Sequence, residues 1–144
     1  MQKKSLVVID IQNDITKNYK EIIDNVNRSI DWAVENEIHV VYIRHYNLSD
    51  GTRTFKPNTR GSELVSDMKL VSKNIFEKSK GNALTSEDFA DFIRKNEISE
   101  FYITGADAIA CVNQPYLICA RKTTKLQSYQ IVLRVMIKGK LTKC

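Results

Sequence analysis

Short apolar runs alternate along this chain with segments of helical spacing. The apolar run Leu6–Ile9 ends at Asp10, which is typical of a strand buried on both faces of a sheet. A helix is predicted next, from about Tyr19 to Asn36, because apolar residues recur there every three or four positions. These residues are Ile22, Ile23, Val26, Ile30, Ala33 and Val34. The first quarter of the chain therefore predicts a strand followed by an amphipathic helix.

The same alternation continues through the rest of the sequence. Residues 44–73 are polar and contain Gly51, Pro57 and Gly61, which predicts a long loop of the kind that is usually functional or disordered. Strands that alternate with helices indicate parallel βαβ units, with right-handed crossovers and a site at the carboxyl ends of the strands. Further strands are predicted over 39–43, 74–76, 101–104 and 130–137, and further helices over 85–96 and from 111 to about 122.

Composition supports a single globular domain over residues 1–144. The chain has 144 residues, of which 42% are hydrophobic, and this is enough apolar material for a core. No apolar run approaches the roughly 18–20 residues that a membrane span requires, and the N-terminus leads directly into the first strand without a signal peptide. We therefore expect a soluble, cytoplasmic protein that does not bind membranes.

The distribution of charge argues against a nucleic-acid partner. The formal net charge is +5, but the 7 basic side chains from Ala108 onward, with no acidic ones, account for the excess. The preceding residues carry 15 basic and 17 acidic side chains. The chain has no basic stripe interleaved with aromatic residues and no helix-turn-helix or zinc-finger spacing. A small-molecule substrate is the expected partner.

Cysteine usage indicates a single reactive thiol. The chain has three cysteines, Cys111, Cys119 and Cys144, which cannot all pair with one another and include no C-x-x-C motif. Cys111 follows the turn after the strand at 101–104 and begins a predicted helix. Helix N-termini favour negative charge, so this position lowers the pKa of a thiol. Cys119 and Cys144 have no such setting.

Three chemically useful segments converge on one edge of the predicted sheet. Asp10 ends the first strand, the segment Glu77–Asn82 follows the third and contains lysines, and Cys111 follows the fourth. A thiol beside a lysine and a carboxylate can act as a nucleophile, with the cation favouring the thiolate and the carboxylate carrying the proton. Each residue also has a simpler interpretation: a turn cap for Asp10, a solvated lysine, and a small buried hydrophobe for Cys111.

The motifs at these positions resemble those of the isochorismatase-like cysteine hydrolases over about residues 5–122. They occur in the family's order and are Leu6–Asp14 (LVVIDIQND), Arg44-His45, Arg60–Leu64 (RGSEL), Lys78–Leu84 (KSKGNAL) and Gly105–Val112 (GADAIACV). The resemblance implies a Rossmann-like three-layer α/β/α fold with a mainly parallel sheet.

The resemblance also implies a catalytic triad, formed by Asp10, Lys78 and Cys111. The main-chain N–H groups of Cys111 and Asp107 would form the oxyanion hole, and a cis peptide bond would join Ala106 to Asp107. Such a bond costs about 2.5–4 kcal/mol outside proline and would mark functional strain.

Two further residues are candidates for the substrate pocket. Gln12, two residues beyond Asp10, would orient that carboxylate or contact the substrate. His45 follows the second strand at the same edge and would line the pocket, although a lone histidine is more often structural. The family's nicotinamidases carry an Asp-x-His-x-x-His metal motif, which neither His39 nor His45 belongs to. We therefore expect no metal and no other cofactor.

The sequence departs from the family's pattern near its C-terminus. Pro115 stands where the family usually has threonine, and the resemblance fades beyond Lys122, as though the last elements were missing. An open sheet left in this way would favour a homo-oligomer. The expected function is metal-independent hydrolysis of a small amide or related carbonyl compound through a Cys111 thioester. The alternative is a catalytically silent relative that serves as a ligand-binding or subunit-interaction module.

Overall fold

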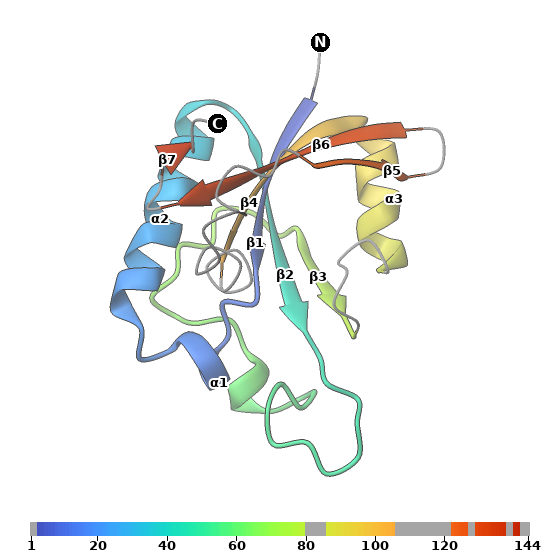
Figure 1. The fold of residues 1–144 in the computed structure, drawn as a ribbon. Coiled ribbons are helices and arrows are strands. Elements are labelled where there is room, and N and C mark those ends of the chain that lie inside the picture. Colours follow the sequence, from blue (N-terminus) through green and yellow to red (C-terminus); the bar gives the residue numbers. More distant parts are fainter. Residues whose placement is uncertain (1–2, 80–85, 106–121, 127–128, 138–139, 142–144) are drawn as a thin grey trace.

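The computed structural model describes residues 3–79, 86–105, 122–126, 129–137 and 140–141, the last three ranges by their main chain. Within them the chain forms a mainly parallel sheet with helices on both faces (Figure 1). The strands are β1 (Lys3–Ile9), β2 (His39–His45), β3 (Ile75–Lys78), β4 (Ile98–Gly105), β5 (Lys122–Leu126), β6 (Tyr129–Ile137) and β7 (Lys140–Leu141). The helices are α1 (Asn13–Thr16), α2 (Lys20–Glu35), the short 3-10 helix η1 (Arg60–Ser62) and α3 (Glu87–Lys95).

The strand order is β3-β2-β1-β4-β6-β5, with β7 paired to β6. All neighbours from β3 to β6 run parallel, whereas β5 and β7 are antiparallel to β6. The central strand β1 therefore lies between β2 and β4, and its carboxyl end is flanked by theirs. This arrangement confirms the predicted α/β class with a mainly parallel sheet.

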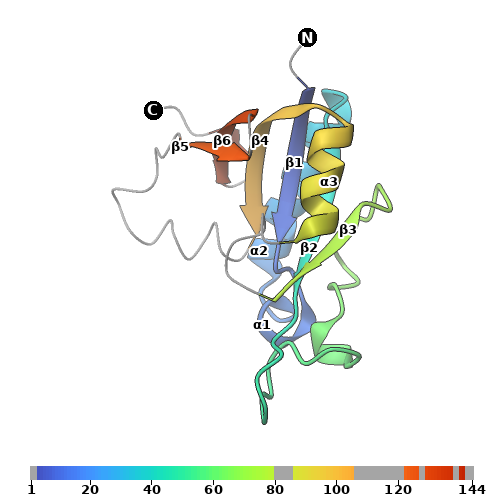
Figure 2. The same ribbon diagram turned by 90° about the vertical axis from the view of Figure 1, so that its right-hand side faces the viewer.

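Alternating residues of the central strands face two separate cores. Leu6 and Val8 of β1 pack with α2, whereas Val7 packs with α3. Figure 2 shows the two helices on opposite sides of the sheet. Most apolar residues that predicted the first helix enter the core on the α2 face of the sheet. Ile23, Val26, Ile30 and Ala33 are buried there, and Ile22 packs against them. Val34 is 52% exposed and lies outside this core.

The α3 face is built from aromatic side chains. Phe89 of α3 contacts Phe101 of β4 and Phe76 of β3, with ring centroids 6.1 Å and 5.6 Å apart. Ser86 caps the helix, because its hydroxyl accepts a hydrogen bond from the N–H of Phe89. The helix start that was predicted at 85–88 is thus confirmed, and the helix ends at Lys95.

The long polar loop is anchored to the core at points that its composition does not reveal. Val65 and Met68 are buried at 3% and 4% exposure in the cluster on the α2 face. The Tyr42 hydroxyl donates to the carbonyl of Lys69 (2.6 Å) and accepts from the N–H of Val71 (3.0 Å). Burial raises the pKa of Tyr42, so the hydroxyl stays protonated and able to donate. Residues 65–71 are therefore anchored to the core by the side chains of Val65 and Met68 and by the two main-chain bonds to Tyr42.

The C-terminal region differs from the prediction. The strand predicted at 130–137 is confirmed as β6, but β5 and β7 were not predicted. Lys122, expected at the end of a helix, begins β5 instead, and the rest of that predicted helix lies outside the described residues, with Pro115 and Cys119. The strand β6 is not an edge of the sheet, because it pairs with β4 on one side and β5 on the other.

Candidate active site

The structure brings Asp10 and Lys78 together at the carboxyl edge of the sheet. Asp10 follows β1, and Lys78 is the last residue of β3, two strands away. The Lys78 Nζ lies 3.4 Å from Asp10 Oδ2, and the two side chains are only 2% and 7% exposed. A buried ion pair has lost most of its hydration, so each charge depends on the other for compensation. The alternating elements predicted that Asp10 and the segment 77–82 meet at this edge, and the resemblance pointed to Lys78 in that segment.

Asp10 turns the chain away from the strand by adopting a left-handed conformation. Its φ is +57°, which is uncommon for a residue other than glycine. Its N–H donates to the carbonyl of Ile43 in β2, and its own carbonyl accepts from the N–H of Gln12, both at 3.0 Å. The main chain on both sides of the carboxylate is therefore fixed. Aspartate is among the residues that tolerate this conformation best.

Gln12 ties three segments together with its carboxamide. The side chain is fully buried, and its Nε2 donates to the carbonyls of His45 (2.9 Å) and Ser62 (2.7 Å). Its Oε1 accepts from the N–H of His45 (2.8 Å). Both of its N–H donors are thus engaged with main-chain oxygens. These bonds hold the main chain of the site at His45 and Ser62, and none of them reaches the Asp10 carboxylate. The two roles expected for Gln12, orienting that carboxylate or contacting the substrate, stay predictions.

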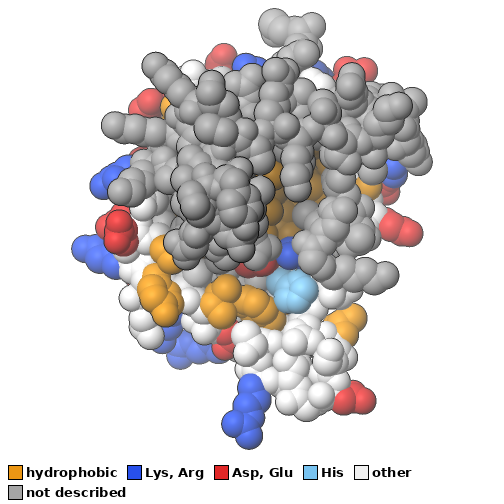
Figure 3. All heavy atoms as spheres, in the orientation of Figure 1, with side chains coloured by type: hydrophobic (Ala, Val, Ile, Leu, Met, Phe, Trp, Pro, Cys, Tyr) orange, Lys and Arg blue, Asp and Glu red, His pale blue; other side chains and the backbone are white. Residues whose placement is uncertain are grey.

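His45 stands beside Lys78. The two residues are register partners in β2 and β3, so their side chains leave the sheet on the same face. His45 is partly exposed, and its ring meets the edge of the Phe55 ring at a centroid distance of 5.5 Å. Figure 3 shows a histidine next to basic, acidic and hydrophobic side chains, at the border of the residues that are not described.

Two residues of this region were not singled out by sequence reasoning. Asp14 of α1 accepts a hydrogen bond from the N–H of Phe55 (2.7 Å), and so connects α1 to the long loop. Asp14 belongs to the LVVIDIQND motif, which was a usable signal for it. Phe55 stands between Thr54 and Lys56 in a polar segment, and its local sequence carries no such signal.

The remaining members of the expected site lie outside the described residues. These are Cys111, Asp107 and the peptide bond between Ala106 and Asp107. The chain approaches that segment at the same edge of the sheet, because Gly105 ends β4 as the register partner of Ile9. Asp10 is the next residue after Ile9. The triad therefore stays a prediction, of which the Asp10–Lys78 pair is the part described.

The described side chains offer no cluster of metal ligands. Among them, no group of three or more His, Cys, Asp or Glu residues is arranged to hold a metal ion. His39 and His45 occupy the two ends of β2, which places their main chains roughly 20 Å apart at the usual rise per residue. These two histidines cannot bind one ion together.

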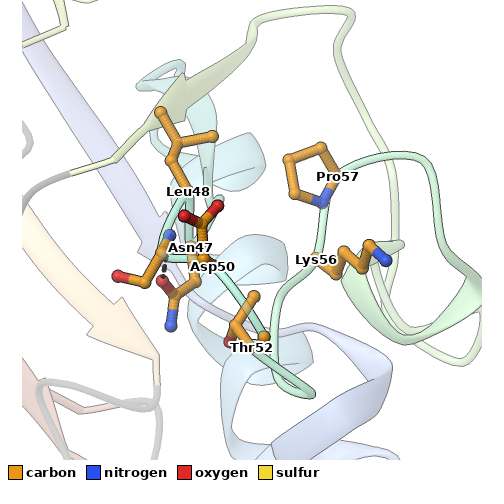
Figure 4. A pocket seen from close by; sticks show the side chains of 8 residues that line it. Asn47, Leu48, Asp50, Thr52, Lys56 and Pro57 are labelled. Carbon is orange, nitrogen blue, oxygen red and sulfur yellow. Dashed lines mark hydrogen bonds between the residues drawn. The ribbon is translucent and has the colours of Figure 1, made fainter.

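A surface hollow of about 410 Å³ lies within the long loop itself. Figure 4 shows it between two limbs of the loop, with Asn47, Leu48 and Asp50 on one limb and Lys56 and Pro57 on the other. Neither Asp10 nor Lys78 lines it. The hollow is therefore separate from the ion pair. Asn47, which lines it, donates its N–H to the carbonyl of Phe55 (2.9 Å) within the same loop.

The chain belongs to the Isochorismatase family, because the Isochorismatase domain model matches residues 4–121. The search of curated proteins finds no match. No helix in the part of the chain that the structure describes has the length and apolar character needed to cross a membrane.

Solved structures agree with this assignment at the level of the fold. N-carbamoylsarcosine amidase from Thermoplasma acidophilum is 22% identical, with a TM-score of 0.61, over 74% of this chain and 69% of that one. Pyrazinamidase of Pyrococcus horikoshii, in complex with zinc, is 20% identical, with a TM-score of 0.60, over 80% of this chain and 79% of that one. A cysteine hydrolase from Pseudomonas syringae pv. phaseolicola is 14% identical, with a TM-score of 0.62, over 74% of this chain and 61% of that one. The chain spans 63% and 57% of the length of two further family structures.

Proposed function

We propose that this protein is a metal-independent cysteine hydrolase that cleaves a small amide or related carbonyl compound. The observation that carries the proposal is the buried ion pair between Asp10 and Lys78 at the carboxyl edge of the sheet, 3.4 Å apart. A buried charge pair gives little net stability and often marks a functional site. Cys111, the first residue of the predicted helix after β4, is the proposed nucleophile.

The first half of the proposed reaction forms a thioester. Asp10 accepts the proton of the Cys111 thiol, and the adjacent Lys78 ammonium stabilises the thiolate. The thiolate attacks the carbonyl carbon to form a C–S bond, and the main-chain N–H groups of Asp107 and Cys111 bind the oxyanion. The C–N bond then breaks, and the amine leaves with the proton that Asp10 carried.

The second half releases the acid and restores the enzyme. Asp10 takes a proton from water, which attacks the thioester carbonyl to form a second tetrahedral intermediate. The C–S bond breaks, the carboxylic acid leaves, and the proton on Asp10 returns to Cys111. Each cycle therefore consumes one amide and one water and yields one acid and one amine.

Two comparisons support amide chemistry at a cysteine. One structural neighbour is named as an amidase and another as a cysteine hydrolase. The zinc of the pyrazinamidase complex has no counterpart in the proposal, because His39 and His45 stand at opposite ends of β2.

A labelling experiment tests the nucleophile. The protein carrying Cys144→Ser, which removes a terminal thiol, is treated with iodoacetamide at neutral pH and analysed by peptide mass spectrometry. Cys111 should be alkylated well before Cys119. Lys78→Ala should remove this preference, and Lys73→Ala, which changes an exposed lysine near β3, should leave it intact. Equal labelling of the two cysteines would contradict the proposal.

Incubation with a panel of small amides then tests the reaction. Brief reaction followed by acid quenching should give a protein whose mass is increased by the acyl group, with the added mass on the peptide that contains Cys111. A reactive Cys111 that never acquires an acyl group from any amide would favour the silent-fold alternative.

A further inference from the structure

We propose that Phe55 determines the substrate specificity of this site and that Asp14 is the positioning residue that holds it there. The inference rests on the proposed function, because it assigns a wall to the same site. It concerns the size of the group next to the reacting carbonyl.

Phe55 is held in a main-chain conformation that an aromatic residue rarely adopts. Its φ is +57°, in the left-handed region, where bulky side chains are genuine outliers. Such a conformation costs of order 1–3 kcal/mol and persists only where the surroundings impose it. An observed outlier of this kind is a reason to look for a function.

Two hydrogen bonds impose this conformation. The N–H of Phe55 donates to Asp14 Oδ2 (2.7 Å), and its carbonyl accepts from the N–H of Asn47 (2.9 Å). The Asp14 carboxylate also lies against Gly61, where a Cβ atom would come within 2.0 Å of Asp14 Oδ1. Asp14 therefore contacts the loop at two points six residues apart in sequence, and both contacts need its carboxylate where it is.

This arrangement places the Phe55 ring one side chain, that of His45, away from Lys78 of the ion pair. The Phe55 ring meets the His45 ring at 5.5 Å and an interplanar angle of 77°. His45 is the register partner of Lys78, so its ring and the Lys78 side chain share one face of the sheet. The His45 main chain is itself held by the Gln12 carboxamide. In the proposal, the Phe55 ring, which contacts His45, bounds the space beside Lys78 from the side of the long loop.

A Phe55 ring held at this position should exclude substrates with bulky groups next to the carbonyl. Because the Phe55 main chain is hydrogen-bonded on both sides of the residue, its Cα atom is held in place, and the ring can leave His45 only by changing its rotamer. The site should therefore prefer amides with small substituents. Truncating the ring, or releasing it from Asp14, should admit larger ones.

Two alkylating amides of different size serve as probes. The rates at which iodoacetamide and N-phenyliodoacetamide modify Cys111 are compared in the Cys144→Ser background, each corrected for its rate with free cysteine. Phe55→Ala and Asp14→Ala should lower the preference for the small reagent at least about tenfold, the scale expected for a change in pocket shape. Asp14→Asn keeps an oxygen that can accept from Phe55 and should restore most of the preference. The control Asp31→Ala, which removes an exposed partner of Lys69, should change nothing.

Limited proteolysis reports on the loop without any reagent in the site. Trypsin should cut after Arg53 and Arg60, which are exposed, faster in Asp14→Ala than in the unmodified protein or in Asp14→Asn. Faster cutting with an unchanged reagent preference would overturn the specificity role of Phe55. Unchanged cutting would overturn the positioning role of Asp14. Failure of the proposed function is distinguishable, because Cys111 would then show no preferential alkylation in the unmodified protein.

Discussion

Gly105 at the end of β4 lies directly against Ile9 at the end of β1. A Cβ atom on Gly105 would stand 2.1 Å from the Ile9 carbonyl oxygen and 2.7 Å from its nitrogen. The φ of Gly105 is +123°, a conformation that L side chains rarely adopt. Since Asp10 follows Ile9, this contact sets the position from which the Asp10 carboxylate reaches Lys78.

Gly105→Ala should therefore destabilise the protein and disturb the site together. The methyl group meets main-chain atoms that cannot rotate away, so β1 and β4 must separate. We expect the free energy of unfolding to fall by about 3 kcal/mol or more, combining conformational strain with overpacking. Urea unfolding followed by circular dichroism measures the loss, and iodoacetamide labelling of Cys111 should slow in the folded variant.

Gly51→Ala is the matched control. Gly51 also has a positive φ, +73°, but nothing lies within 4 Å of the position of its Cβ atom. Only the conformational cost of about 1–2 kcal/mol should then appear, without any effect on labelling. If the two variants lose equal stability, the contact between Gly105 and Ile9 is not what requires glycine.

The Asp10–Lys78 pair should show strong coupling between its two members. Asp10→Asn or Lys78→Met alone leaves one buried charge without its partner, which typically costs about 3–5 kcal/mol. The double variant should recover much of this loss, while alkylation of Cys111 stays slow in all three proteins. Urea unfolding of the four proteins gives the coupling energy directly.

The control for this cycle is the exposed pair Lys69–Asp31, whose side chains are 50% and 51% exposed. Lys69→Met, Asp31→Asn and their combination should each change stability by less than about 1 kcal/mol. Additive losses at Asp10 and Lys78 would mean that the two charges do not depend on each other, contrary to the buried geometry.

The part of the site that the sequence predicted follows from the order of elements. Asp10 and Lys78 are 68 positions apart, yet Asp10 follows β1 and Lys78 ends β3, and the carboxyl ends of parallel strands lie at one edge of the sheet. Strand assignment was therefore enough to bring Asp10 and the segment 77–82 to one edge, and the family resemblance singled out Lys78 within that segment. The apolar periodicity of α2 was equally informative, because nearly every predicted position faces β1, β2 or β4.

The loop contacts were not predictable in the same way. Phe55 stands between polar neighbours, and Val65 and Met68 lie in a short mixed stretch, ELVSDMKLV, in which other apolar residues such as Leu70 are exposed. Their burial and contacts depend on which distant main-chain groups the loop meets, such as Asp14 in α1. Likewise, β5 has the basic sequence KTTKL, which is also typical of the end of a helix. Only its pairing with β6 identifies it as a strand.

Hydrolysis should be independent of metal ions. Any amide hydrolysis found with the substrate panel should persist within error after treatment with EDTA and 1,10-phenanthroline, and metal analysis should find no stoichiometric zinc or iron. The physical reason is the placement of His39 and His45 at opposite ends of β2. Activity that is lost on chelation and restored by one metal per chain would contradict this prediction.

The chain should assemble into a homodimer or a higher oligomer. Among the described strands, β5 pairs only with β6 and leaves its other side open, which makes it an edge strand of the sheet. The described surface also carries large exposed hydrophobic side chains, namely Ile15, Tyr19, Val34, Leu48, Leu70 and Val71. An open edge and exposed apolar area both favour contact between copies of one chain.

Light scattering at micromolar concentration should then give a mass of at least twice 16.6 kDa. Hydrogen exchange on diluting the protein tests where the contact lies: amides of β5 and β6 should lose protection as the oligomer dissociates, whereas those of β2, inside the sheet, should not. Loss of protection that is confined to α2 would place the contact on the helical face instead. A stable monomer with protected β6 amides would show that the chain covers its own sheet, and the assembly prediction would be wrong.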